Sequence, residues 1–288
     1  MTNYLHKVLP PQYSHVNKVY CLLAATVFCA LPLCSTEAAA ENILKYDGTT
    51  NIHGNAKTWA AKNEYDGIDI RVTGVDGGYY TDTTEALVLN NQTLNVKGKG
   101  KFVSIINTAQ NKQIDNNGGI YAKGGSTVNF TDVDSIYIAA IAGKEGGNDS
   151  TVISAKDPGR DLKGYTNIVN ISGTTVQLIG SIDVMHSLGS VFFNRNARHT
   201  VNAALSGSDS FWYGSAIGET DERTTVNLSL ADGATWIFNA GKSTLNAGGI
   251  IRNLKLDKGV VLFADAEVWE TYRKTCLLYT SDAADDRI

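Results

Sequence analysis

The chain has 288 residues, 43% of them hydrophobic, and a formal net charge of −4 at pH 7. This mildly acidic balance argues against nucleic acid as a partner, because a nucleic-acid-binding domain carries a basic patch. The four cysteines, Cys21, Cys29, Cys34 and Cys276, all lie near the two ends. The long middle of the chain must therefore be stabilised by its core rather than by disulfides, and thiol catalysis is excluded there.

The first forty residues have the pattern of a secretory signal peptide. Lys7 and Lys18 precede an apolar run over residues 19–33, and small side chains follow at Ala38 and Ala40. The run is too short to span a bilayer comfortably. We therefore predict a signal-peptide helix within residues 1–40 that is cleaved after Ala40. The alternative is a buried or membrane helix that the mature protein keeps.

From Glu41 onward the sequence predicts strands and little helix. No window keeps apolar residues at helical spacing for three turns without glycine or β-branched interruption. Short apolar or alternating runs are separated by glycine-rich and polar turn clusters. The candidate strands are residues 86–89, 102–106, 135–141, 175–182 and 211–217. We predict one all-β domain over residues 41–275, with a sandwich as the structural rival to a solenoid.

A short unit of the form Val-Asn-apolar recurs along this domain. It begins at Val128, Val169, Val201 and Val226, with spacings of 41, 32 and 25 residues, and Leu94 begins a looser copy. Such irregular spacing suits a solenoid whose loops vary in length, whereas a propeller would have a steadier period.

Residues 224–263 show the strand and turn pattern most clearly. Apolar and polar side chains alternate over 224–230, as in a half-buried strand, and an aromatic and β-branched run follows at 235–238. Two further strands are predicted around Leu254 and at 260–263, each preceded by a turn or loop.

These forty residues resemble the passenger repeat of pertactin-like and AIDA-like autotransporters. That family shows a strand, an A-x-W unit, a turn containing serine, a leucine strand and a closing L-x-L-x-x-G-x-V-x-F. The matching positions are Ala234, Trp236, Ser243, Leu245, Leu254, Leu256, Gly259, Val261 and Phe263.

The resemblance implies a right-handed parallel β-helix, secreted and displayed at the outer membrane and cell surface of a Gram-negative bacterium. It further implies a non-enzymatic, adhesin-like passenger that binds a host or cell-surface glycan or protein through its loops. A C-terminal outer-membrane barrel, which would export and anchor the passenger, is expected beyond the present chain. The residue alternation alone implies only a multi-stranded β structure.

The end of the chain has a different character. Residues 276–286, CLLYTSDAADD, resemble the translation of a sequencing-library transposase adapter. We therefore expect residues 276–288 to be an artefact, and residues 41–275 to be a passenger fragment. Residues 272–275 resemble the start of the next strand of the family repeat, Y-K-T-L-T, with Arg273 where lysine is usual.

Residues 207–210, Gly-Ser-Asp-Ser, are similar to the G-D-S-G surround of a trypsin-like nucleophile, but the order is wrong. A triad would also need a histidine and an aspartate close in space, and the candidates past the signal segment are His53, His186 and His199. A polar turn is the preferred interpretation.

Other motifs also have a simple structural explanation. Residues 146–150 resemble one fragment of a calcium-binding nonapeptide, which binds metal only in stacked copies. Asp132 and Asp134 would share one face of a strand and are expected to be solvated. His186 and His199 lack further ligands at zinc spacing.

Residues 211–213, Phe-Trp-Tyr, are a candidate carbohydrate-contact patch, although core packing is the commoner role of strand aromatics. We assign no catalytic, cofactor-binding or metal-binding residue and expect no cofactor. A secreted β-helical enzyme acting on polysaccharide and a passive stalk for a downstream domain are the alternatives to the adhesin-like passenger.

Overall fold

The computed structural model describes residues 42–50, 62–74, 84–109, 117–141, 151–156, 164–184, 197–218, 222–239 and 251–263. The chain divides into two units, Met1–Ala40 and Glu41–Ile288. The predicted signal peptide (1–40) and the predicted artefact (276–288) lie outside the described residues, so both stay predictions. Everything below concerns the second unit.

The described part of the chain is all-β, as the sequence predicts. It contains no helix long and apolar enough to cross a membrane. Its strands are β1 (Ile43–Thr50), β2 (Gly67–Gly74), β3 (Thr84–Asn90), β4 (Thr93–Lys97), β5 (Phe102–Ala109), β6 (Asn117–Lys123), β7 (Thr127–Ile141), β8 (Thr151–Ala155), β9 (Thr166–Ile179), β10 (Ser181–Asp183), β11 (Arg198–Ser206), β12 (Phe211–Gly214), β13 (Ala216–Ile217), β14 (Thr224–Ala231), β15 (Thr235–Phe238), β16 (Asn253–Asp257) and β17 (Val260–Phe263).

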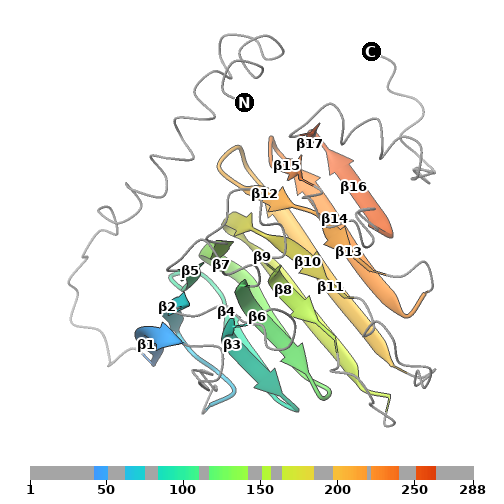
Figure 1. The fold of residues 1–288 in the computed structure, drawn as a ribbon. Coiled ribbons are helices and arrows are strands. Elements are labelled where there is room, and N and C mark those ends of the chain that lie inside the picture. The colour runs from blue at the N-terminus through green and yellow to red at the C-terminus, as the bar shows by residue number, and fades with distance from the viewer. Residues whose placement is uncertain are drawn as a thin grey trace. The chain divides into compact units, whose positions relative to one another are not determined.

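These strands pair in parallel in two sheets. The smaller sheet has the order β13-β10-β8-β6-β3, and the main path of the larger one is β1-β2-β5-β7-β9-β11-β14-β16. In Figure 1 the colour advances from each strand to its neighbour across the sheets, which shows that the chain adds strands in one direction. Sandwiches are built from antiparallel sheets, so the parallel pairing excludes that alternative.

The larger sheet has two parts, because the long strands β7 and β9 each serve both. The first halves of these strands join β4, β11, β14 and β16 in what we call the Asn sheet. Their second halves join β1, β2, β5, β12, β15 and β17 in what we call the Trp sheet. From β3 to β15 the chain visits the smaller sheet, the Asn sheet and the Trp sheet in turn, and each circuit pairs with the one before it. This parallel arrangement is consistent with the predicted β-solenoid.

Alternation along each strand produces the core. On β14, Val226, Leu228 and Leu230 are buried while the residues between them are half-buried on the outer face. The same alternation on neighbouring strands places apolar side chains directly above one another, since the register keeps inward residues opposite inward residues. Each circuit therefore buries its inward side chains against adjacent circuits.

Two tryptophans stack on one another in this core. Trp212 on β12 and Trp236 on β15 are register partners whose rings stack with centroids 5.1 Å apart at 8°. Their indole N–H groups donate to the carbonyl oxygens of Gly180, at 2.9 Å, and Gly214, at 3.1 Å. A Cβ at Gly214 would lie 2.1 Å from the Gly180 oxygen, so this position needs glycine.

The final circuit, β16 and β17, is less well covered than the circuits beneath it. Leu256 on β16 is 45% exposed, whereas its register partner Leu230 is fully buried. Val260 on β17 is 42% exposed. These side chains have neighbours on one side only among the residues that the structure describes.

Candidate binding groove

A ladder of asparagines crosses the outer face of the Asn sheet. Its members occupy one register position on successive strands: Asn95, Asn129, Asn170, Asn202, Asn227 and Asn253. Each side-chain amide donates to the amide oxygen of the preceding member, at distances of 2.9, 2.7, 2.7, 2.6 and 2.7 Å in chain order. The first member donates to the backbone oxygen of Asn63 at 3.1 Å.

The sequence produces this ladder through the repeat described above. In the copies at the first five members the residues flanking asparagine are apolar and turn inward, so the asparagine between them must turn outward. Asn253 follows Arg252 instead of an apolar residue and takes its place through the register of β16 with β14. Asparagine is a poor strand former when isolated. Stacked in register, each amide finds a donor or acceptor on the next strand, and this pairing offsets the unfavourable propensity.

Four members of the ladder border a groove of about 330 Å³ on the same outer face. The groove crosses the neighbouring strands β9, β11, β14 and β16. Its lining is Thr131, Asn170, Ile171, Ser172, Asn202, Ala203, Ala204, Asn227, Leu228, Ser229, Asn253 and Lys255. Ala204 is exposed and lies between Ser172 and Ser229 in register, so three small side chains run beside the larger asparagines.

The groove carries little charge. Lys255 is the single charged side chain among the lining residues, and the others offer amides, hydroxyls and aliphatic carbon. Amides and hydroxyls both donate and accept hydrogen bonds near neutral pH without titrating. The groove is therefore suited to binding, while the lining itself offers no carboxylate or imidazole for proton transfer.

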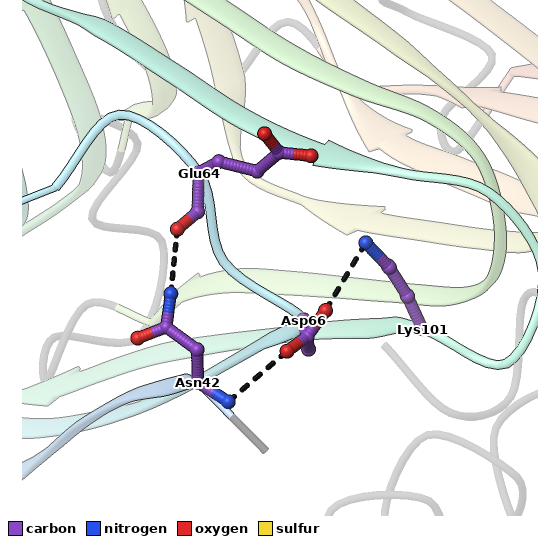
Figure 2. Close-up of polar contacts among 4 residues, drawn as sticks. All are labelled: Asn42, Glu64, Asp66 and Lys101. Carbon is purple, nitrogen blue, oxygen red and sulfur yellow. Dashed lines mark hydrogen bonds and ion pairs between the residues drawn. The ribbon is translucent and has the colours of Figure 1, made fainter. Parts of the chain in front are cut away.

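A polar cluster ties together the first circuits near the start of the described residues (Figure 2). Asp66 accepts a hydrogen bond from the backbone N–H of Asn42 at 3.1 Å and pairs with Lys101 at 3.2 Å. The Asn42 side chain donates to the Glu64 carbonyl oxygen at 2.7 Å. The Asn42 N–H and the Lys101 ammonium favour the charged carboxylate and lower the pKa of Asp66 below its usual value of 3.8.

His199 lies inside the structure, fully buried, rather than at a surface metal site. The Asn167 amide oxygen accepts from the backbone N–H groups of Gly125 and Ser126, at 2.9 and 3.0 Å. Its NH₂ group therefore points to His199 Nδ1, 3.2 Å away, which makes Nδ1 the acceptor. His186 lies outside the described residues. Within the described ranges no group of three or more His, Cys, Asp or Glu side chains could hold a metal ion.

Residues 207–210 form the turn between β11 and β12. The Ser210 hydroxyl donates to the Ser206 carbonyl oxygen at 2.6 Å and accepts from the Val176 N–H at 3.0 Å. Ser210 is fully buried, so its hydroxyl fastens the turn to the neighbouring circuit. Of the histidines considered for a triad, His53 and His186 lie outside the described residues, and His199 is engaged with Asn167.

The remaining candidates are also placed at turns or in the core. Asp132 and Asp134 are exposed on either side of buried Val133, and the Asp134 carboxylate accepts from the Gly100 N–H at 3.0 Å. The calcium-like residues 146–150 lie outside the described part. The aromatic run 211–213 divides: Trp212 is in the core, while its two neighbours are half-buried on the outer face of the Trp sheet.

No protein-family model, no curated protein and no solved structure matches this chain. The groove itself was not anticipated from the sequence. The sequence signal that could have indicated it is the repeated asparagine, because an asparagine next to an inward-facing residue lies on the outer face in each copy of the repeat.

Proposed function

We propose that this chain is the non-enzymatic passenger of an autotransporter, exported through a signal peptide and displayed at a Gram-negative cell surface as an adhesin-like binding protein. Its fold would be a right-handed parallel β-helix. The resemblance of residues 224–263 to passenger repeats supports this proposal, and so does the parallel stacking of successive circuits. A C-terminal outer-membrane barrel encoded beyond this chain is part of the same proposal.

The observation that carries the binding function is the groove beside the asparagine ladder, whose lining has one charged side chain. It offers polar side chains that the fold fixes in position across four adjacent strands. A surface with repeated equivalent positions can contact a repeating or multivalent ligand at several points, and several weak contacts then add up to useful affinity. A glycan or a protein on another cell surface is the partner class.

Exposure of the full exported chain to intact cells tests this function. We expect the purified protein to bind animal or bacterial cell surfaces in a saturable manner and to release no reducing ends from a panel of polysaccharides. Release of reducing ends would favour the alternative, a secreted β-helical polysaccharide-active enzyme. Absence of both binding and cleavage would favour a passive stalk for a downstream domain.

A further inference from the structure

The geometry of the groove selects an elongated ligand. Neighbouring strands in a sheet are about 4.8 Å apart, so the four asparagines on β9, β11, β14 and β16 form a row about 14 Å long. The row runs across the strands, from circuit to circuit. A polymer that lies along the row would meet an equivalent amide at every step, whereas a compact ligand would meet one or two.

The ladder leaves each interior amide with unused hydrogen-bonding capacity. An asparagine side chain has two N–H donors and two acceptor lone pairs, and the ladder consumes one of each. Asn202, for example, donates to Asn170 and accepts from Asn227, and so retains one donor and one acceptor. Because both neighbours already hold the amide in place, a ligand loses little affinity to side-chain ordering.

The lining also distinguishes between classes of polymer. With Lys255 as its single charge, the groove gives an anionic or cationic chain no row of counter-charges. An extended peptide is bound at an open strand edge or through deep apolar pockets. The groove lining forms no deep apolar pocket, and the open edge of β16 lies at one end of the groove and not along the asparagine row. A neutral chain of sugars presents hydroxyls to the amides and C–H groups to the exposed methyl of Ala204.

We propose that the groove binds a neutral, linear polysaccharide that lies along the asparagine ladder. This inference rests on the proposed binding function and names its site and ligand class. The amide donors and acceptors that the ladder does not use form hydrogen bonds with the sugar hydroxyls. The ladder holds these amides at a fixed spacing.

Calorimetric titration of the full chain tests the proposal. The probes are cello- and malto-oligosaccharides from two to six sugars, with oligogalacturonate of six sugars as the charged comparison. We expect affinity for at least one neutral series to rise tenfold or more from the disaccharide to the hexasaccharide. The charged hexamer is expected to bind at least tenfold more weakly than the best neutral one.

Ala204→Lys fills the groove without replacing an asparagine of the ladder and should weaken hexasaccharide binding at least tenfold. Thr93→Lys is the matched control, since Thr93 is also exposed on the Asn sheet but does not line the groove, and it should bind as the parent does. Ser229→Lys serves as a second groove-filling variant if Ala204→Lys fails to fold.

Two results overturn the proposal: no binding of any neutral oligosaccharide, or binding that both groove-filling variants leave unchanged. If the protein binds cell surfaces in either case, the ligand class is wrong while the proposed binding function stands. If it binds neither cells nor sugars, the binding function fails as well.

Discussion

At the scale of single residues, the asparagine ladder shows how a weak local preference becomes a regular feature. Each interior member depends on two others that are 25 to 41 residues away in the sequence. An interior member takes part in two amide bonds, while Asn253, the last described member, donates one. Position within the ladder should therefore decide the cost of a substitution.

Replacing Asn202 by Asp tests that dependence. The carboxylate still accepts from Asn227 but cannot donate to Asn170, and two neighbouring oxygens then face each other. We expect a loss of about 1 kcal/mol in the free energy of unfolding, measured by urea denaturation at pH 7. Asn253→Asp, at the last described member, is the control and should cost less, because Asn253 is exposed to water. Equal losses would show that the position of an asparagine within the ladder does not affect the cost of replacing it.

Asp66 should make part of the stability depend on pH. Its pKa is lowered in the folded state by the Asn42 N–H and by Lys101, so the unfolded chain binds the proton more tightly. The contribution is present above the unfolded value, near pH 4, and is lost as the pH falls through the folded pKa. Asp66→Asn should therefore make the free energy of unfolding depend less steeply on pH between about pH 2 and 5. A variant with the parent profile would contradict the role of this carboxylate.

At the scale of elements, the fold was largely predictable and the groove was not. Alternation and turn residues placed β14, β15, β16 and β17 within residues 224–263, and the Val-Asn repeat marked strands that pair in register. Periodicity identifies the inward face of a strand but not how strands bend. The two parts of the larger sheet meet where the register between β7 and β9 shifts, between Phe130 and Val133, with Asp132 in left-handed backbone (φ 58°) and Val133 opposite Gly173. The groove depends on which outer side chains become neighbours across circuits, and only the register supplies that information.

The two stacked tryptophans provide a test of core packing between elements. Trp236→Ala removes a ring that contacts Trp212 and Phe238, and should lower the free energy of unfolding by about 3–5 kcal/mol. Ile237→Ala, the neighbouring residue on the outer half-buried face, should cost clearly less. Chemical denaturation followed by far-UV circular dichroism gives both values. Similar costs would mean that the inward and outward faces of β15 have been assigned wrongly.

At the scale of the whole molecule, each circuit depends on its neighbours, as is general for stacked repeats. The final described circuit exposes Leu256 and Val260, and β16 and β17 each have a strand partner on one side in the described structure. An open, partly apolar strand edge favours pairing between molecules. This edge is where self-association is expected to begin.

Charging that edge should therefore reduce self-association. We expect the double substitution Leu256→Lys and Val260→Lys to lower the concentration-dependent light scattering of the purified chain, because lysine on an edge strand opposes pairing. The double substitution Thr174→Lys and Ala204→Lys adds the same two positive charges at exposed positions on β9 and β11, which have strand partners on both sides, and controls for the effect of net charge. If the control lowers scattering as much as the edge variant, association does not proceed through β16 and β17.

The asparagines of the ladder are unevenly spaced along the sequence, and this has a mechanical consequence. Successive rungs are separated by 34, 41, 32, 25 and 26 residues. A stretched chain extends by about 3.3–3.6 Å per residue. Pulled from its ends, the protein should lengthen in unequal steps of roughly 80 to 150 Å, one for each circuit that detaches. The order of long and short steps in a single-molecule force trace would then reveal the end from which the stack comes apart.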